Sequence, residues 1–379
     1  MKIGINTLFL IPGEVGGTET YLRQTLLAMA EHFPEASLVL FTNRENDPVL
    51  RKDLGGFSQV KFVLLDFEAS NRYARIIREQ IELPGKVKES GVDVLWSPGY
   101  TAPFFSPCPQ VVTIHDMQYK TYPLDLSFQA RIVTDLLVKM SAKRCERVIA
   151  VSRFSKDEIV KYTGVSSDKV DVVYEAANQA FGEVVSVEKR KAMLAELVPV
   201  DRPYILSVAN TYPHKNIHLL VRAFGEVMGR IPHNLVLVGN ARLGEGEVQA
   251  ELKTISDKDR VIRLKKLSMQ QLVPLYQGCD VFVFPSLYEG FGLPVLEAMM
   301  AGVPVLTTNK ASIPEVGGDG VKYFNPAEKG DLCAKIGEII AMSRQDRATL
   351  VNRAKEITKG FYWKWTAQRS LETICKALE

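Results

Sequence analysis

Short apolar runs alternate along the chain with longer stretches in which apolar residues recur every three or four positions. Such runs predict buried strands, and their nearly continuous apolar character is typical of parallel strands that are covered on both faces. We expect strands at residues 2–10, 37–42, 61–65, 92–97, 110–116, 147–152, 170–174, 204–209, 234–239, 260–264, 281–286 and 303–308.

The longer stretches predict helices between these strands. Residues 18–30 have the spacing of an amphipathic helix, with Thr18 as its candidate N-cap. Ser155 and Glu158 form a capping-box pattern that would open another helix. Residues 127–145 carry a helical stripe made of Phe128, Ile132, Leu136, Leu137 and Met140. Further helices are expected at residues 217–230, 268–277 and 343–379.

This alternation predicts the α/β fold class, with two Rossmann-like, doubly wound domains that face a cleft. A chain of 379 residues is too long for one core, since cores usually stop growing near ~250 residues. The alternation pauses over residues 175–202, which we interpret as the linker. We therefore expect an N-terminal domain at residues 1–180, a second domain at 181–355 and a C-terminal helical segment at 356–379.

Charge and cysteine content exclude several classes of protein. The 47 basic and 44 acidic residues give a net charge of +3, which is too balanced to predict binding to nucleic acid. The five cysteines are scattered without a CxxC pair, so we expect free thiols and no zinc site. No apolar run approaches the ~18 residues of a membrane span. The expectation is a cytoplasmic protein.

The most informative loop follows the strand expected at residues 281–286. Pro294 suits the first turn of the next helix, and Gly302 suits its end. Glycines in the loop let backbone N–H groups approach a ligand at the positive end of that helix, which suits phosphate. Glu289 precedes the glycines, and Glu297 is expected in the first helical turn, where an acid also has a purely electrostatic explanation. Carboxylates accept the paired hydroxyl hydrogen bonds that sugar and ribose diols offer.

The segment FPSLYEGFGLPVLEAMMAGVPV resembles the donor-site segment of family 4 of the glycosyltransferases, which have the GT-B fold. The resemblance extends over essentially the whole chain and is to bacterial, mannosyltransferase-like members of group 1. It implies an N-terminal acceptor-side domain, a second domain that binds the donor, and a C-terminal helix that packs back on the first. It also implies that Glu289 faces the donor hexose and that Glu297 grips the nucleotide ribose. The backbone that would meet the sugar and the diphosphate belongs to Gly290, Phe291, Gly292 and Leu293.

The resemblance also gives a role to the turn after the strand expected at residues 204–209. Lys215 matches the family lysine that neutralises the departing diphosphate, although an exposed lysine is the simpler interpretation of these residues alone. Many members carry an arginine five residues earlier, where this chain has Asn210. We therefore expect one cationic contact to be missing from the donor site, with His214 and Arg263 as candidates to replace it.

Two positions in the first domain match the family as well. Gly16 and Gly17 correspond to a glycine loop whose N–H groups lie near the donor phosphate and the acceptor, although by themselves they indicate only a tight turn. His115 ends a buried strand and corresponds to a histidine that hydrogen-bonds the donor sugar, whereas a lone histidine is more often structural. Asp116 is expected to orient the loop.

Two further segments are candidates for contacts with the nucleobase and with the acceptor. The loop that packs the nucleobase in relatives would correspond to Arg263, Leu264 and Leu267. A basic helical stretch is either a solvated helix face or a contact with the acceptor or a membrane surface. This stretch contains Arg72, Tyr73, Arg75 and Arg78.

These assignments imply a retaining glycosyltransferase that moves a hexose from a nucleoside-diphosphate sugar to an acceptor hydroxyl, in cell-surface polysaccharide or glycolipid synthesis. The isolated aspartates form no DxD-type metal motif, so we expect a metal-independent reaction without a cofactor. The TYPHKN sequence resembles that of mannosyl-type bacterial members, and this resemblance favours GDP-mannose over a UDP-sugar as the donor. The acceptor would be a saccharide or a lipid-linked saccharide, met at the inner face of a membrane. Two alternatives remain: a sugar-nucleotide 2-epimerase on the same fold, and a non-catalytic sugar-nucleotide-binding subunit.

Overall fold

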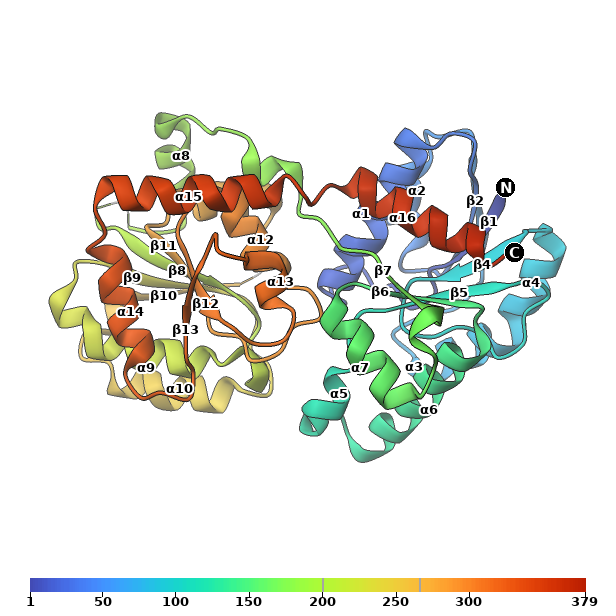
Figure 1. Ribbon diagram of the computed structural model, residues 1–379, viewed down its shortest axis with the longest axis horizontal. Helices are drawn as coiled ribbons and strands as arrows, with labels where there is room; N and C mark the ends of the chain where they lie inside the picture. Colours follow the sequence, from blue (N-terminus) through green and yellow to red (C-terminus); the bar gives the residue numbers. More distant parts are fainter. Residues whose placement is uncertain (200, 266) are drawn as a thin grey trace. The chain divides into compact units, whose positions relative to one another are not determined.

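The computed structural model describes residues 1–199, 201–265 and 267–379. The chain forms two compact units: Met1–Ala176 together with Phe361–Glu379, and Ala177–Gly360. Each unit is a parallel sheet covered by helices (Figure 1). The α/β class and the two Rossmann-like domains predicted from the alternating pattern are therefore confirmed. The sequence predicts domain boundaries after residues 180 and 355, whereas the chain passes from one unit to the other after residues 176 and 360.

The sheet of the first unit has the strand order β3-β2-β1-β4-β5-β6-β7, and its neighbouring strands are parallel. Its central strands are buried because helices cover both faces, which explains why their sequences are apolar without alternation. The strands are β1 (Lys2–Asn6), β2 (Ser37–Thr42), β3 (Val60–Leu64), β4 (Val94–Ser97), β5 (Gln110–Ile114), β6 (Arg147–Ala150) and β7 (Val170–Val172).

The helices of the first unit include the last one of the chain. On one face of the sheet, Tyr21 of α1 contacts both Trp96 of β4 and Trp363 of α16, edge to face. Thr366 of α16 also donates to the carbonyl oxygen of Tyr174 at 2.8 Å. The helices are α1 (Gly17–His32), α2 (Asp47–Leu54), α3 (Arg72–Ile77), the π-helical η1 (Arg78–Glu82), α4 (Leu83–Ser90), α5 (Gln118–Thr121), η2 (Pro123–Asp125), α6 (Phe128–Arg144), α7 (Arg153–Thr163), η3 (Ser167–Lys169) and α16 (Trp363–Lys376).

The second unit repeats the same design with the strand order β10-β9-β8-β11-β12-β13, again in parallel. Helices α9, α10 and α14 cover one face of this sheet and share a core with it (Figure 1). The strands are β8 (Tyr204–Val208), β9 (Asn234–Val238), β10 (Val261–Leu264), β11 (Val281–Phe284), β12 (Val305–Thr308) and β13 (Lys322–Phe324). The helices are η4 (Gln179–Gly182), α8 (Val187–Leu194), η5 (Pro213–Lys215), α9 (Ile217–Val227), η6 (Met228–Arg230), α10 (Glu245–Thr254), η7 (Lys258–Arg260), α11 (Met269–Gly278), α12 (Leu293–Met300), α13 (Ile313–Gly317), α14 (Asp331–Ile340) and α15 (Arg344–Thr358).

The order of strands places one switch point in each sheet, where the chain changes its direction of travel across the sheet. It lies between β1 and β4 in the first unit and between β8 and β11 in the second. Ligands of open α/β sheets bind beside the carboxyl ends of the strands at such points. The loops that carry the predicted site residues of the second unit, after β8 and after β11, therefore meet at the expected place.

Two predicted helix caps are wrong. The N-cap of α1 is Gly16 rather than Thr18, because the backbone turns there at φ +59°, a conformation that glycine adopts without strain. The N-cap of α7 is Ser152, whose hydroxyl accepts from the backbone N–H of Ser155 at 2.9 Å. Ser155 is thus inside the helix, and its own hydroxyl donates to the carbonyl oxygen of His115 at 2.7 Å.

Two further predictions from the sequence pattern differ from the structure: one strand was missed, and the helical tail is divided into two helices. Strand β13 was missed because its exposed first residue, Lys322, interrupts the short apolar run. The tail was expected to be one helical segment but is divided into α15 and α16, which belong to different units. The chain leaves the helical conformation between them at residues 359–362, where Gly360 lies.

The apolar stripe of α6 does not have the environment that its spacing suggests. A helix of this kind normally turns its apolar stripe toward the core, yet Phe128, Ile132 and Leu136 are exposed. The helix is anchored instead by its C-terminal half, where Val138 and Ala142 pack against β5 and β6. The stripe therefore lies on the surface of the first unit.

Candidate functional site

An ion pair joins the two loops at the switch point of the second unit. The ammonium nitrogen of Lys215 lies 2.6 Å from a carboxylate oxygen of Glu289, and both side chains are largely buried. Lys215 ends the short turn after β8, and Glu289 lies in the loop after β11. Because β8 and β11 are neighbours, their carboxyl ends bring together two residues that are 74 positions apart. The site therefore presents a cation and an anion that neutralise one another.

The loop that carries Glu289 is fixed by hydrogen bonds to its backbone. The buried hydroxyl of Ser312 lies 2.9 Å from the carbonyl oxygen of Glu289 and 2.8 Å from that of Phe291. The backbone N–H of Leu287 donates to the carbonyl oxygen of His214 at 2.8 Å, which ties this loop to the turn after β8. The loop is therefore held in place before any ligand binds.

The glycine loop ends at the start of α12, as the sequence predicted. Gly292 is the N-cap and has φ +108°, a region that strongly favours glycine. Pro294 lies in the first turn, where no N–H donor is needed. Phe291 and Leu293 are buried on either side of Gly292. The beginning of α12 is the positive end of the helix dipole, which is the end that a phosphate would meet.

Glu297 lies one turn later than predicted. Since α12 begins at Leu293, Glu297 is in the second turn, where it gains little from the positive end of the helix. Its carboxylate accepts a hydrogen bond from the hydroxyl of Tyr276 in α11 at 2.8 Å. Removal from water raises the pKa of Glu297 to about 7, although the Tyr276 hydrogen bond lowers it. Glu297 is therefore a carboxyl group that exchanges its proton near neutral pH.

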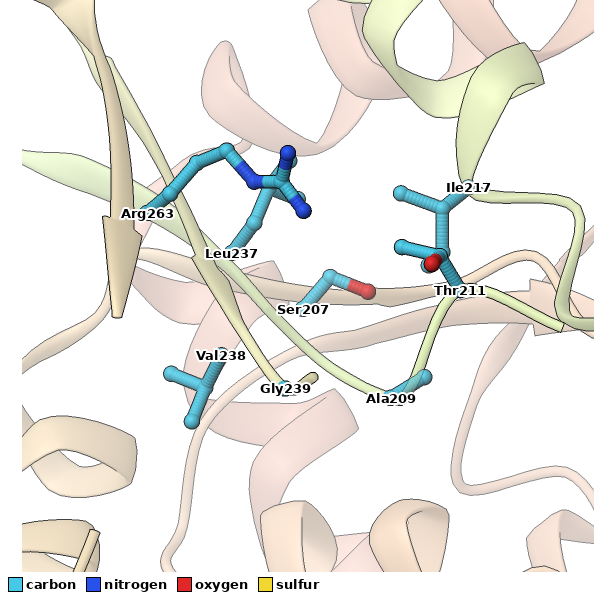
Figure 2. Close-up of a pocket in the computed structure, with 8 residues that line it drawn as sticks. All are labelled: Ser207, Ala209, Thr211, Ile217, Leu237, Val238, Gly239 and Arg263. Atoms are coloured by element: carbon cyan, nitrogen blue, oxygen red, sulfur yellow. The ribbon is translucent and has the colours of Figure 1, made fainter. Parts of the chain in front are cut away.

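A small pocket lies at the carboxyl ends of β8, β9 and β10 (Figure 2). Figure 2 shows the side chain of Ser207 between Arg263 on one side and Ile217 with Thr211 on the other. The Ser207 hydroxyl is buried and has no hydrogen-bond partner among the described residues. The remaining lining residues are Ala209, Leu237, Val238 and Gly239. This pocket is thus lined by an unsatisfied hydroxyl, a guanidinium group and apolar side chains.

Arg263 is the charged wall of this pocket, and Glu245 of α10 holds it in place. Two guanidinium nitrogens of Arg263 lie 2.5 and 2.9 Å from the two carboxylate oxygens of Glu245. The hydrogen bond from Arg263 lowers the pKa of Glu245 to about 2. Leu264 ends β10 and accepts from the backbone N–H of Gly239 at 2.9 Å, and Leu267 is partly buried. Lys266, within the predicted nucleobase loop, lies outside the described residues.

Asn210 and His214 do not replace the missing arginine. Asn210 has a local structural contact, because its side-chain oxygen accepts from the backbone N–H of Asn240 at 2.8 Å. Burial and the nearby charge of Lys215 lower the pKa of His214 to about 3, so His214 is neutral at physiological pH. The suggestion that His214 supplies the cation is therefore wrong, and Arg263 remains as the candidate.

His115 is held on both ring nitrogens by residues of the first unit. Its Nε2 lies 2.9 Å from the carbonyl oxygen of Pro98, and its Nδ1 lies 3.2 Å from a carboxylate oxygen of Glu175. The rings of Tyr21 and Tyr100 pack against the imidazole at 4.9 and 5.2 Å. A carbonyl oxygen can only accept, so Nε2 carries the proton that points toward Pro98, and Nδ1 faces the carboxylate of Glu175.

The other residues predicted in the first unit lie around two loops. Gly16 and Gly17 begin α1, and the preceding loop is fixed by Glu19, which accepts from the N–H of Gly13 at 2.6 Å. Asp116 accepts from the hydroxyl of Tyr100 at 3.0 Å and from the N–H of Gln118 at 2.9 Å, the loop-orienting role predicted for it.

Sequence reasoning missed Ser312, Tyr276 and Glu175. Ser312 precedes Ile313-Pro314, a helix-start signal of the kind used elsewhere in the chain. Tyr276 and Glu175 gave no such signal, because their importance comes from contacts with residues far away in the sequence. Among the residues that the structure describes, no cluster of three or more His, Cys, Asp or Glu side chains is placed to hold a metal ion. No helix within the described ranges is both long and apolar enough to cross a membrane.

Two family models match the chain. Residues 15–180 match the model described as Glycosyltransferase Family 4, and residues 188–357 match the one described as Glycosyl transferases group 1. Together the two models match most of the chain, and the two Rossmann-like units are those of the GT-B fold of glycosyltransferases. The chain belongs to family 4 of these enzymes.

The relatives that the chain matches include two O-antigen chain mannosyltransferases. The chain is 31% identical to the O-antigen chain mannosyltransferase RfbU of Salmonella typhimurium, over 58% of each protein. It is 28% identical to the O-antigen chain mannosyltransferase B of Escherichia coli, over 67% of this chain and 66% of that one. The chain therefore spans less than two thirds of the length of these relatives.

The fold is shared with more distant proteins of known structure. The crystal structure of HepE from Anabaena in complex with UDP-glucose superposes with a TM-score of 0.78 at 20% identity, over 99% of this chain and 100% of that one. WaaG, a glycosyltransferase involved in lipopolysaccharide biosynthesis, gives a TM-score of 0.73 at 13% identity, over 98% of this chain and 99% of that one. At these identities the comparison supports the fold alone.

Proposed function

We propose that this protein is a retaining hexosyltransferase that moves mannose from GDP-mannose to a hydroxyl of a saccharide or lipid-linked saccharide in the synthesis of a cell-surface polysaccharide. The mannosyltransferase names of RfbU and its Escherichia coli counterpart support the sugar and the product class. The acceptor would be met at the inner face of the membrane.

The observation that carries the proposal is the Lys215–Glu289 pair beside the start of α12. Transfer develops negative charge on the leaving diphosphate and positive charge on the sugar ring, so a cation and an anion side by side match both charges. In this proposal Lys215 and the N–H groups after Gly292 stabilise the diphosphate, without a metal ion or a cofactor. Glu289 faces the hexose, and Glu297 accepts from the ribose hydroxyls.

The pocket of Figure 2 is assigned to the nucleobase in this proposal. Arg263 and the unsatisfied hydroxyl of Ser207 offer hydrogen-bond donors to carbonyl oxygens of a base, and the apolar walls suit its rings. HepE, in its structure, is in complex with UDP-glucose, so the choice of base needs a direct test.

A thermal-shift series with GDP, UDP, ADP and their mannose and glucose conjugates tests the donor. At ~100 times its Kd, the correct nucleotide should stabilise the protein by about 2.7 kcal/mol. The transfer itself is tested with the stabilising donor and mannose-containing acceptors, with and without EDTA, and NMR of the product reports the anomeric configuration. A preference for UDP, loss of transfer in EDTA, or an inverted product would each refute the corresponding part of the proposal.

A further inference from the structure

The charged side chains described so far in the second unit cancel in pairs. Lys215 is paired with Glu289 at 2.6 Å, and the guanidinium group of Arg263 is held by both carboxylate oxygens of Glu245. His214 adds no charge, because burial and the charge of Lys215 lower its pKa to about 3. A diphosphate carries negative charge on both phosphates, and an anion that leaves water needs a compensating cation. These described residues together supply no net positive charge for it.

The loop after β12 lies along the loop that carries Glu289. Strands β11 and β12 are parallel neighbours, and the hydroxyl of Thr308, the last residue of β12, donates to the carbonyl oxygen of Ser286. Further along the chain, the hydroxyl of Ser312 donates to the carbonyl oxygen of Glu289 at 2.9 Å. The segment between these two contacts, residues 309–311, therefore adjoins the candidate site.

The same segment also adjoins the start of α12. Gly292 is the N-cap of α12, and a Cβ atom at this glycine would stand 4.0 Å from the Cγ1 atom of Ile313. The backbone N–H of Ile313 donates to the carbonyl oxygen of Lys310 at 3.2 Å, so Ile313 and Lys310 belong to one turn. Helix α13, which follows this turn, packs beside α12 (Figure 1). Lys310 thus lies in a turn that borders the positive end of α12.

Lys310 itself is an exposed cation. Its ammonium group forms no ion pair and no hydrogen bond with the residues that the structure describes. Two residues of chain separate Lys310 from Ser312 and span at most about 7 Å. The flexible four-carbon stem of a lysine carries its charge beyond that distance. The ammonium group of Lys310 can therefore reach a phosphate at the start of α12.

The backbone of this turn is held in an unfavourable conformation. Ala311 has φ +53°, in the left-handed region that a residue with a Cβ atom rarely adopts. Such strain persists only where the surrounding structure imposes it, and it is most common at functional sites. The hydrogen bonds made by Lys310 and Ser312, on either side of Ala311, hold the turn in this form. The position from which the Lys310 side chain leaves the backbone is therefore fixed.

From these contacts we propose that Lys310 is a second cation of the donor site and pairs with the diphosphate of the sugar nucleotide, while Lys215 is shared with Glu289. The inference deepens the proposed function and rests on it for the position of the diphosphate at the start of α12. Arg263 is the competing candidate, but it is bound to Glu245 and lines the pocket assigned to the base. Lys310 therefore contacts phosphate, and Arg263 contacts the base.

Titration calorimetry of the full chain with two ligands tests this assignment. The ligands are inorganic pyrophosphate and the nucleoside diphosphate that stabilises the wild type most in the thermal-shift series. Lys310→Met should raise the Kd of both ligands at least ~10-fold, which is the scale of one hydrogen bond to a charged group. Binding should also become less dependent on salt, because one ionic contact is lost. Lys310→Arg keeps the charge and should retain most of the affinity for both ligands.

Two further variants control for general effects of charge. Lys322 is also an exposed lysine of the second unit without an ion pair among the described residues, but it begins β13, whereas Lys310 follows the end of β12. Lys322→Met should therefore leave both Kd values unchanged. Arg263→Met should weaken binding of the nucleoside diphosphate and leave that of pyrophosphate unchanged, since it removes a contact with the base. Equal melting temperatures of the free proteins would show that the lysine variants are folded.

Failure of this inference can be told apart from failure of the proposed function. If the wild type binds both ligands and Lys310→Met binds them as tightly as Lys322→Met does, the role of Lys310 is excluded and the proposed function stands. A loss of pyrophosphate binding in Arg263→Met but not in Lys310→Met would assign the phosphate contact to Arg263 instead. If the wild type binds no nucleoside diphosphate of any base, the proposed function and the inference are both overturned.

Discussion

Lys215 and Glu289 form an ion pair at 2.6 Å between the loops that follow two adjacent strands, β8 and β11. The pair gives the donor site of the proposal a cation and an anion that are already in place, with their mutual attraction satisfied until a ligand binds. A diphosphate that approaches Lys215 would compete with Glu289 for the same ammonium group. Binding and orientation of Glu289 are therefore coupled, and both residues should matter for the chemical step.

Replacement of either partner should lower turnover strongly. Lys215→Met removes the charge that would stabilise the leaving diphosphate, and Glu289→Gln removes the anion beside the sugar. Each should lower kcat by about 100-fold or more, from the size of single electrostatic contributions in enzymes. The measurement is steady-state transfer with the donor found by thermal shift. Lys335→Met, in an exposed pair with Glu338, is the control and should keep normal turnover. A near-normal kcat in either site variant would remove that residue from the mechanism.

The raised pKa of Glu297 makes stability depend on pH. A carboxyl group whose pKa is about 7 in the folded state, above its ordinary value of 4.5, binds a proton more tightly when folded. Its contribution to stability is therefore full at low pH and is lost as the pH rises from about 4.5 to about 7. Glu297→Gln should remove this loss and raise the free energy of unfolding at pH 8, by roughly 2–3 kcal/mol at most, with little effect at pH 4.5. Urea unfolding at the two pH values measures the difference, and an equal effect at both would contradict the assignment.

Nucleotide affinity gives a second test of Glu297. If the carboxylate accepts from the ribose, Glu297→Ala should weaken binding of the nucleoside diphosphate by about 1–3 kcal/mol, the usual cost of a lost charged hydrogen bond. Titration calorimetry with the nucleoside diphosphate and with pyrophosphate, which lacks the ribose, separates the contact with the ribose from that with phosphate. Unchanged affinity for the nucleotide would exclude the ribose contact.

The hydrogen bonds of Ser312 predict that the loop carrying Glu289 loosens when the hydroxyl is removed. Ser312→Ala deletes the buried hydroxyl that contacts the carbonyls of Glu289 and Phe291, and should cost about 1–2 kcal/mol of stability. Because the loop carries Glu289, donor affinity should fall as well. Ser256→Ala, at an exposed serine of the same unit, should change neither quantity. Normal donor affinity in Ser312→Ala would show that the loop keeps its conformation without this contact.

The contact between His115 and Glu175 predicts that two substitutions of Glu175 differ in their effect on stability. Glu175→Gln keeps a partner for Nδ1, because the amide can donate to a neutral imidazole whose proton remains on Nε2 toward Pro98. Glu175→Leu leaves a buried nitrogen without a partner and should destabilise the protein by about 1–3 kcal/mol. Thermal unfolding of the two variants should therefore rank Gln close to the wild type and Leu well below it. Equal stabilities would show that the pair carries no net energy.

The amino-acid sequence by itself determined the fold class and the chemistry of the main loop. Continuous apolar runs separated by helical periods can only be buried by parallel sheets with helices on both faces, so both sheets were predictable from local pattern. The glycine at 292 and Pro294 likewise fix the start of α12 through local backbone geometry, which needs no distant partner.

Tertiary structure decided what each side chain of the site meets. The pairing of Lys215 with Glu289 follows from the adjacency of β8 and β11, and the contact of His115 with Glu175 joins residues 60 positions apart. Local periodicity likewise could not show that the stripe of α6 faces away from the core, because a period marks the side of a helix and only packing decides whether that side is covered. Hydrogen bonding, desolvation and exposure depend on neighbours that the strand order brings together, and these were settled only when the chain folded.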